Sequence, residues 1–187
     1  MDNIDIKTEM IPVLPLRGLV IFPGSIIHFD VVRKSSVQAL SDGMNNNQLV
    51  FITAQKKATD GESTTDNLYS VGVLTKVLQI AKISDTTFRV VAHGLSRCKA
   101  LSFTDIGAYI KAEIYEIPLK ASSDSIKKEA MMNMVKDMFD EFAMLNTHVP
   151  QDMRLSVHDM DDAGRLADYI ADNIIISTFN FKNNRIF

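Results

Sequence analysis

Apolar positions in the first 118 residues alternate with polar ones in short segments, and proline and glycine interrupt the pattern. The opening stretch contains three short apolar runs, at residues 13–16, 19–22 and 25–32. Pro15, Arg17-Gly18 and Pro23-Gly24 break up these runs, because proline removes a donor from a strand ladder and glycine supplies a positive φ. The pattern predicts short strands that change direction at fixed points, as at the start of a compact β-domain.

Further segments with the composition of strands follow. They are residues 49–54, 69–83, 87–92, 95–103 and 108–118. Apolar residues occupy both faces of segment 69–83, so we expect both of its sides to be covered, as in a barrel or a sandwich. Residues 35–43 show helical spacing, with Ser35 or Ser36 as N-cap and Gly43 as C-terminal stop. We therefore expect about six strands and one short helix in a small β-barrel-like domain.

The hydrophobic period changes from 2 to 3.6 at Pro118. Helices are predicted beyond it, at residues 124–145, 151–157 and 163–176, and Asp161 or Asp162 caps the last of them. The expected fold class is α+β, with a β-rich domain over residues 1–118 and a helical subdomain over residues 119–187. The final residues keep an apolar pattern without a capping signal, so we expect a chain truncated at its C-terminus.

The first predicted helix carries a methionine-rich apolar stripe. The helix has an apolar stripe of Ile126, Ala130, Met134, Met138 and Phe142, with Val135, Phe139 and Leu145 beside it, and its methionine-rich stripe consists of Met131, Met132, Met134, Met138 and Met144. Helical spacing favours the interpretation that this stripe packs into the core of the helical subdomain. The alternative is an adaptable binding surface, because methionine side chains repack readily.

Charge and composition narrow the classes of partner. The 187-residue chain has a net charge of −3 and a pI near 5.8. Without a basic surface, tight binding to nucleic acid through phosphate neutralisation is not expected. The N-terminus is unlike a signal peptide and no apolar run approaches 18 residues, so we expect a cytoplasmic protein with no membrane partner. The single cysteine, Cys98, is interpreted as a structural thiol.

The sequence contains no catalytic or metal-binding motif that we recognise. It has no Gly-Lys dipeptide, so a phosphate-binding Walker loop is excluded, and no serine lies in a Gly-x-Ser-x-Gly elbow. None of the four histidines has a second ligand at metal-binding spacing. Asp159, Asp161 and Asp162 are interpreted as favourable charge at a helix N-terminus. These observations favour a binding module with no catalytic residue, no metal and no cofactor of its own.

Four blocks of the sequence, taken in order, resemble the Lon protease N-terminal domain, a PUA-like substrate-recognition module. They are residues 14–17 with 20–24, residues 68–73 with 77–80, residues 90–97, and residues 162–168. The last block, Asp-Ala-Gly-Arg-Leu-Ala-Asp, is similar to the family's Asp-Pro-Gly-Arg-Leu-Ala-Asp, with Ala163 in place of the usual proline. His93 stands where the family often has an acidic residue.

The resemblance implies a non-catalytic N-terminal fragment of a cytoplasmic ATP-dependent serine protease. The parent protein, by this resemblance, uses ATP and Mg in an ATPase module and cleaves with a Ser-Lys dyad, and both modules lie downstream. The fragment is then expected to bind unfolded or damaged protein substrates and to aid hexamer assembly. Two alternatives stay open. One is a free-standing relative of this domain that binds peptides or small ligands, and the other is RNA binding, which the negative charge disfavours.

Candidate site residues follow from what a sensor of unfolded proteins needs, namely exposed apolar side chains. In the predicted strand 88–93, Val90 and Ala92 share a core face, whereas Val91 lies between polar residues on the opposite face. Val91 and the turn residues Phe22 and Pro23 are therefore the predicted substrate-binding residues.

Structural roles are assigned to other residues of the matching blocks. They are Gly24, Gly72, Gly94 and Arg165. Gly24 follows Pro23 in a turn and is predicted to have a positive φ.

Overall fold

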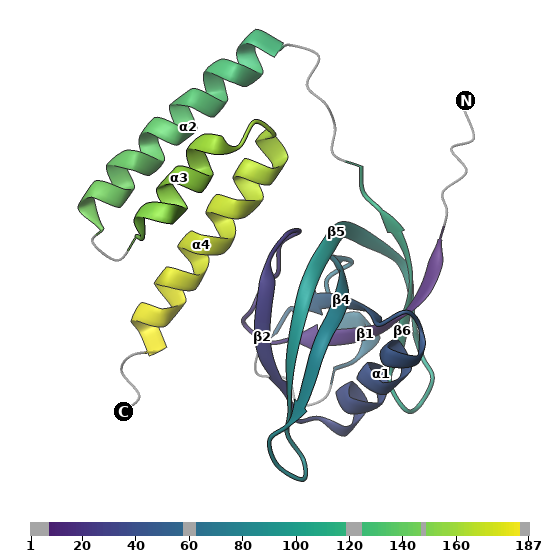
Figure 1. Ribbon diagram of the computed structural model, residues 1–187. Helices are drawn as coiled ribbons and strands as arrows, with labels where there is room; N and C mark the ends of the chain where they lie inside the picture. Colours follow the sequence, from purple (N-terminus) through teal and green to yellow (C-terminus); the bar gives the residue numbers. More distant parts are fainter. Residues whose placement is uncertain (1–7, 58–62, 119–124, 147–148, 184–187) are drawn as a thin grey trace, which may run out of the picture. The chain divides into compact units, whose positions relative to one another are not determined.

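The computed structural model describes residues 8–57, 63–118, 125–146 and 149–183, without the side chains after residue 174. The chain divides into two compact units, Met1–Pro118 and Leu119–Phe187. The first unit is built around a β-sheet and the second from helices, so the α+β fold class is confirmed (Figure 1). Each unit has its own core and is described separately below.

The described residues of the first unit form six strands, one α-helix and one turn of 3₁₀ helix. In chain order these are β1 (Glu9–Leu16), β2 (Ile26–Val31), α1 (Lys34–Asn45), β3 (Leu49–Ala54), η1 (Thr65–Asn67), β4 (Val71–Lys82), β5 (Phe88–Asp105) and β6 (Ile110–Glu116). The sheet order is β2-β5-β4-β3-β1-β6, and β5 also pairs with β6. This last pairing closes five strands into a small barrel and leaves β2 attached to the side of β5.

Strand β5 is one continuous element of 18 residues, not the two predicted strands. Its first half pairs with β2 from Val31↔Phe88 to Ile26↔His93, and its second half pairs with β6 from Cys98 to Asp105. Near Gly94 the strand β5 leaves its partner β2 and continues toward its partner β6. A single long strand therefore belongs to both the barrel and the β2 ribbon.

Two register shifts in the pairing of β4 with β5 change which residues reach the core. They lie between Leu74 and Thr75 and between Val77 and Gln79. Strict alternation places Val77 and Ile80 on opposite faces, but the shift between them turns both toward the same core cluster. The predicted strand with apolar residues on both faces is present. Part of that apolar pattern arises because the bulges change the face on which later residues lie.

The opening stretch differs from its prediction in two ways. Pro15 does not interrupt the chain, because both Pro12 and Pro15 lie inside β1. Residues 9–12 of β1 pair only with β6, and residues 13–16 pair only with β3. Each proline therefore has a neighbouring strand on one side only, where a missing N–H is tolerated. The predicted strand at residues 19–22 is wrong, since these residues form an irregular connection from β1 to β2.

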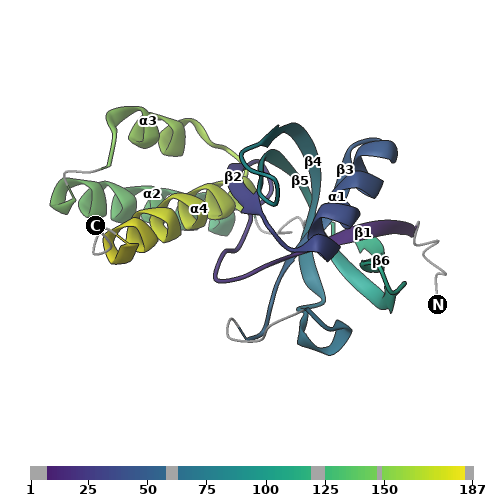
Figure 2. The ribbon, with the colours of Figure 1, turned by 90° about the horizontal axis from the view of Figure 1, so that it is seen from below.

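Helix α1 is longer than predicted and has different ends. Its N-cap is Arg33, not Ser35 or Ser36, and no side chain caps it. Gly43 lies inside the helix rather than at its C-terminal stop, and it is buried. A Cβ built on Gly43 would lie 2.6 Å from Val50 Cγ1 and 2.8 Å from the Leu49 carbonyl oxygen. Glycine is thus present so that α1 can pack closely on β3, beside which it lies in Figure 2.

Two clusters of buried side chains form the core of the first unit. One gathers inward residues of β1, β2, β3, β4, β5 and α1 and of the connection between β1 and β2: Leu14, Ile21, Ile27, Val31, Ala39, Leu40, Val50, Ile52, Val73, Val77, Val90 and Ala92. The other lies toward β6: Ile11, Val13, Phe51, Leu68, Cys98, Ala100, Ile110, Ala112 and Ile114. The predicted alternation of residues 109–116 is present, because Ile110, Ala112 and Ile114 are all buried.

The second unit consists of α2 (Ser125–Leu145), α3 (Gln151–Asp159) and α4 (Ala163–Asn183). The carboxylate of Asp162 accepts a hydrogen bond of 2.8 Å from the Arg165 backbone N–H, so Asp162 is the cap of α4. Lys136 of α2 donates 2.7 Å hydrogen bonds to the carbonyl oxygens of His158 and Met160 at the end of α3. His158 itself lies within α3, not at the predicted helix break.

The favoured interpretation of the methionine stripe on α2 holds for Met132, which is buried, and is wrong for Met131, Met134, Met138 and Met144. Met134 and Met138 are 62% and 57% exposed, and Ile126 is 80% exposed. The buried residues of α2 are Met132, Phe139 and Ala143, which lie on a neighbouring face of the helix. Met132 and Phe139 pack with Val157 of α3 and Leu166 of α4. The period of the apolar residues identified the helix. It did not identify the buried face, because α2 carries apolar residues on more than one face.

Candidate functional site

The first half of β5 presents its alternate residues to the outside of the barrel. Val90 and Ala92 are fully buried, whereas Val91 between them is partly exposed. Val91 lies opposite His28 of β2 and Gln79 of β4. The structure thus places the predicted site residue Val91 near the middle of an outward face formed by β2, β5 and β4.

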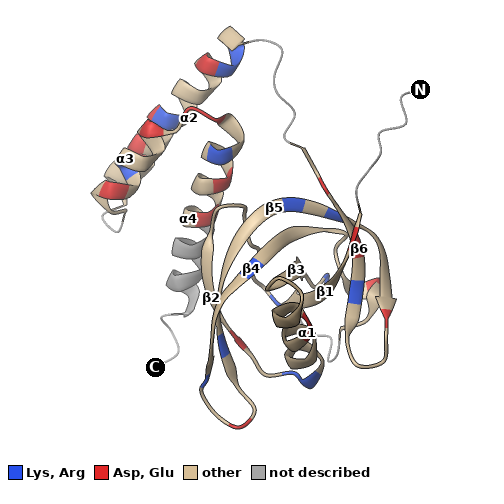
Figure 3. Ribbon diagram, turned by 45° about the vertical axis from the view of Figure 1, so that its right-hand side comes forward, with Lys and Arg blue, Asp and Glu red and all other residues tan. Residues whose placement is uncertain are grey.

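Other apolar side chains lie on this outward face around Val91. Ile26 is 60% exposed and lies opposite His93, two residues along β5 from Val91. Leu95 of β5 and Leu78 of β4 are the residues without a strand partner at the two register shifts between these strands, and both are exposed. We call Ile26, Leu78, Val91 and Leu95 the outer-face patch. In Figure 3 the ribbons of β2, β4 and β5 are mostly tan, with blue segments along β5.

One ion pair borders the outer-face patch. The guanidinium of Arg89 on β5 donates to both carboxylate oxygens of Asp30 on β2, at 2.8 and 3.0 Å. These hydrogen bonds hold the pKa of Asp30 below its ordinary range. The pair joins neighbouring strands on the solvent side and neutralises the only acidic residue of β2.

The predicted turn residues Phe22 and Pro23 border the same two strands. Gly24 has φ of 86°, in the left-handed region, and its N–H donates to the Gly94 carbonyl oxygen at 2.8 Å. The Gly94 N–H donates to the Ser25 carbonyl oxygen at 2.9 Å. The turn therefore sits against β5 three residues from Val91, and Phe22 and Pro23 are each partly buried there.

Gly94 is required for this close approach. A Cβ at this position would lie 2.5 Å from the Phe22 carbonyl oxygen. Gly72 on β4 has a similar role, since a Cβ there would collide with the Ile52 carbonyl oxygen and the Phe51 ring. Arg165 has an exposed side chain in the first turn of α4 and belongs to the helical unit.

A polar cluster that the sequence did not predict fixes the ends of β1 and α1. Gln55 is 94% buried, and its Oε1 accepts hydrogen bonds from Arg17 Nε and Arg33 Nη2, each at 2.9 Å. Arg33 Nη1 also donates to Ser63 Oγ at 2.6 Å. Each residue comes from a different segment, so no local motif could have indicated the cluster. Its role is to hold the connection between β1 and β2 against the start of α1.

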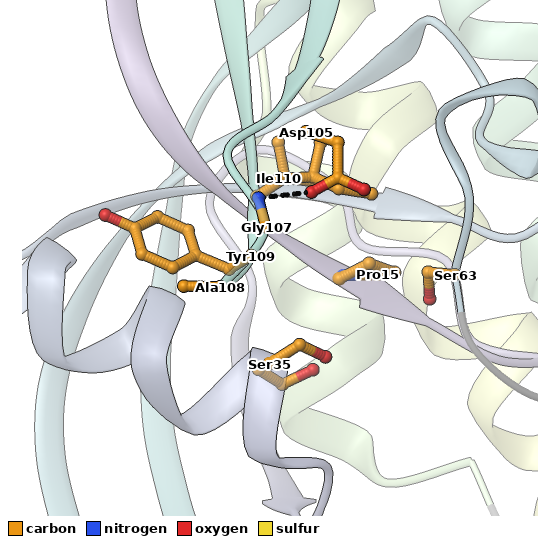
Figure 4. Close-up of a pocket in the computed structure, with 10 residues that line it drawn as sticks. Pro15, Ser35, Ser63, Asp105, Gly107, Ala108, Tyr109 and Ile110 are labelled. Carbon is orange, nitrogen blue, oxygen red and sulfur yellow. Dashed lines mark hydrogen bonds between the residues drawn. The ribbon is translucent and has the colours of Figure 1, made fainter.

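A small hollow lies between β1, the start of α1 and the turn after β5. Figure 4 shows Pro15, Ser35, Ser63 and Tyr109 around it, with a 2.8 Å hydrogen bond from the Gly107 N–H to Asp105 Oδ1. Its volume of about 70 Å³ has room for only a few water molecules and is far below the size of a ligand pocket. The outer-face patch is a better candidate for a functional site than this hollow.

Other reactive groups are not arranged for chemistry in the part of the chain that the structure describes. Burial raises the pKa of the Cys98 thiol, despite the neighbouring Arg97 and Lys99, which supports its structural role. Among the described residues, no three His, Cys, Asp or Glu side chains are grouped as metal ligands. None of the described helices combines the length and the apolar character needed to span a membrane.

The described residues form a β-barrel unit and a helical unit, and the outer-face patch is the candidate binding surface. The family model described as the ATP-dependent protease La (LON) substrate-binding domain matches residues 10–180. This chain belongs to that family of Lon substrate-binding domains, as the four blocks of sequence predicted.

Known relatives agree with this assignment. The chain is 34% identical over 172 residues to a Lon protease of Clostridioides difficile, covering 90% of this chain and 22% of that protein. It is 30% identical over 181 residues to a Lon protease of Desulforamulus reducens, covering 97% of this chain and 22% of that protein. The chain thus spans about a fifth of the length of these curated relatives.

Solved structures share the fold. The N-terminal domain of a Mycobacterium avium complex Lon protease aligns with a TM-score of 0.69 at 19% identity, over 86% of this chain and 80% of that one. A Lon N-terminal domain protein from Xanthomonas campestris aligns with a TM-score of 0.53 at 12% identity, over 87% and 97% of the two chains. The α+β arrangement described above is therefore that of Lon N-terminal domains.

Proposed function

We propose that this chain is the non-catalytic N-terminal part of a cytoplasmic, ATP-dependent Lon-type protease and that it binds unfolded or damaged proteins. The family match and the Lon protease relatives support this proposal. The chain also contributes to assembly of the parent hexamer. ATP and Mg are used by other parts of the parent protein.

The observation that carries the proposal is the outer-face patch. Its four residues come from three strands, and three of them are between 41% and 60% exposed. Exposed apolar side chains gathered on one face mark an interaction surface, and an unfolded chain displays the complementary groups that a native protein hides. Each side chain buried on binding contributes only about 1–3 kcal/mol, so binding is weak and tolerant of sequence.

The proposal is tested by removing apolar surface at the predicted site. Phe22→Ser combined with Val91→Ser is expected to weaken binding of a reduced, carboxymethylated model protein, measured by fluorescence anisotropy. The control is Leu101→Ser, because Leu101 is an exposed apolar residue on the same strand, ten residues from Val91. Equal loss of affinity in both variants, or no loss in the double variant, would place the binding surface elsewhere.

The absence of activity is tested separately. The chain alone is expected neither to hydrolyse ATP nor to cleave casein, because its sequence contains no phosphate-binding loop and no activated nucleophile. Casein turnover that persists through a second independent purification would contradict the proposed non-catalytic role.

A further inference from the structure

Strand β2 is an edge strand whose second side has no partner among the described residues. It pairs with β5 over Ile26 to Val31 and stands at the end of the sheet order. An edge strand presents a row of backbone donors and acceptors that can pair with another extended chain. The free side of β2 is therefore a place where a chain could add to the sheet.

The register shows which backbone groups face away from β5. The Gly94 N–H donates to the Ser25 carbonyl oxygen, and alternate residues of an antiparallel strand bond to the same side. The backbone groups of Ile27, Phe29 and Val31 therefore face β5. Those of Ile26, His28 and Asp30 face away, and no hydrogen bond to another described residue satisfies them.

β2 lacks the features that usually prevent strand addition. Protected edges carry proline, lysine or a bulge, or are covered by another segment. The sequence of β2, Ile-Ile-His-Phe-Asp-Val, contains neither proline nor lysine, and its register with β5 has no bulge. Its one acid, Asp30, is held across the sheet by Arg89 rather than projecting over the free edge.

Apolar surface lies on both faces of this edge. The outer-face patch lies on one side, with Ile26 on β2 itself. On the inner side, a hollow of about 300 Å³ is lined by residues that include Leu16, Leu19, Phe29 and Val31. Because side chains of a strand alternate between the faces, a strand added beside β2 places one set near the patch and the other near the hollow.

We propose that β2 binds an extended segment of unfolded polypeptide as an additional strand of the sheet. This inference rests on the proposed function and specifies how the substrate is held. Backbone hydrogen bonds supply affinity that is independent of sequence, and the two apolar surfaces favour segments with alternating apolar side chains. Such segments are common in unfolded proteins and are already paired in native ones.

The main variant blocks the edge without breaking the existing ladder. His28→Pro removes an N–H that faces away from β5, and the pyrrolidine ring occupies the space of an added strand. The matched control is Lys34→Pro, because Lys34 is the first residue of α1 and Arg33 before it is already extended, with φ of −70° and ψ of 135°. His28→Pro is expected to weaken binding of a reduced, carboxymethylated model protein at least tenfold, and Lys34→Pro less than twofold.

Two measurements on the unaltered chain accompany the variants. Amide hydrogen exchange at Ile26, His28 and Asp30 is expected to be fast in the free chain and to slow when the model protein binds. A ten-residue alternating apolar peptide is expected to compete for the site, whereas the same peptide with alternate backbone nitrogens methylated is not. Exchange in the unaltered chain decides the question if His28→Pro does not fold.

Each result separates this inference from the proposed function. Unchanged binding by a folded His28→Pro variant, or unchanged exchange at the three amides, overturns strand addition and leaves substrate binding intact. A chain that binds no unfolded protein overturns both. Slow exchange at these amides before substrate is added, together with a dimer in sedimentation, shows that a second copy occupies the edge and also overturns the proposal.

Discussion

At the scale of single residues, glycine sets where backbone segments of the barrel approach one another. Gly94 admits the Phe22 carbonyl oxygen, and Gly43 admits the Leu49 carbonyl oxygen and the Val50 side chain. At both positions the missing side chain is required by packing. Gly24 differs, because its positive φ is required and the space around it is open. These two kinds of glycine respond differently to substitution.

Gly43→Ala provides a test in which two effects have opposite signs. Helix propensity alone predicts that alanine stabilises α1 by about 1 kcal/mol. The structure predicts the reverse, because the new Cβ would lie 2.6 Å from Val50 Cγ1 and 2.8 Å from a backbone oxygen. We expect the free energy of unfolding to fall by about 1–2 kcal/mol in urea denaturation. Gln38→Ala, at an exposed position of the same helix, serves as control and is expected to be neutral or slightly stabilising.

Gly24→Val tests backbone strain without a steric clash. No atom lies within 4 Å of a Cβ built at this position, so any loss comes from forcing valine into φ near 86°. We expect destabilisation of about 1–3 kcal/mol, seen as a lower thermal midpoint. Gly24→Asn is expected to cost less, because asparagine tolerates left-handed φ better than valine does. Equal midpoints for glycine and valine would contradict the turn described here.

At the scale of elements, the sequence predicted the buried face of a strand well where apolar and polar residues alternated strictly. It predicted the buried face poorly where they did not. Residues 110–116 and 88–93 alternate cleanly, and their buried faces are as predicted. Pro15 misled the prediction, because proline is tolerated in a strand with only one neighbour and the sequence does not show neighbours. The edge position of β2 could not be predicted either, since it depends on β5 pairing with three strands.

Mutations on the buried and on the exposed face of helix α2 are expected to change the free energy of unfolding by different amounts. Met134→Gln with Met138→Gln is expected to change the free energy of unfolding by less than about 0.5 kcal/mol, because both side chains are mostly exposed. Phe139→Ala is expected to cost about 3–5 kcal/mol, because Phe139 is buried against α3 and α4. A large loss in the methionine variant would show that this stripe is packed after all. The comparison uses thermal unfolding of the helical signal in the full chain.

Acid is expected to weaken the contact between α2 and α3. Asp140 of α2 pairs with His158 Nε2 at 2.8 Å and accepts from Arg154 Nε at 3.2 Å, both from α3. The His158 hydrogen bond, followed by that of Arg154, holds the pKa of Asp140 below its ordinary value. A lowered pKa stabilises the fold above the unfolded-state pKa of about 3.9, and this contribution is lost as the pH falls through the folded-state value.

Asp140→Asn separates this effect from general acid unfolding. The thermal midpoint of the unaltered chain should exceed that of the variant at pH 6, and the difference should shrink toward pH 3. A difference that is independent of pH would mean that the carboxylate charge does not matter for this contact.

At the scale of the whole molecule, the two units have separate cores. The core clusters of the first unit contain only residues before Pro118, and the cluster of the second contains only residues after it. We therefore expect a fragment of residues 1–118 to fold alone. Its NMR signals for Val90 and Ala92 should match those of the full chain, and strand β4 should resist limited proteolysis in both. A fragment with the narrow signal dispersion of an unfolded chain would contradict this independence.

The pairing of β1 with β6 has a consequence for how the protein is made. Glu9 lies opposite Ile114, so β1 meets β6 only after more than a hundred further residues have been translated. Until then the barrel cannot close, and β1 is left with β3 as its only neighbour. Pairings this distant in sequence slow folding to milliseconds or longer in small domains. During synthesis the nascent chain therefore exposes strands whose partners have not yet been made. The position of β6 along the chain determines how long this exposure lasts.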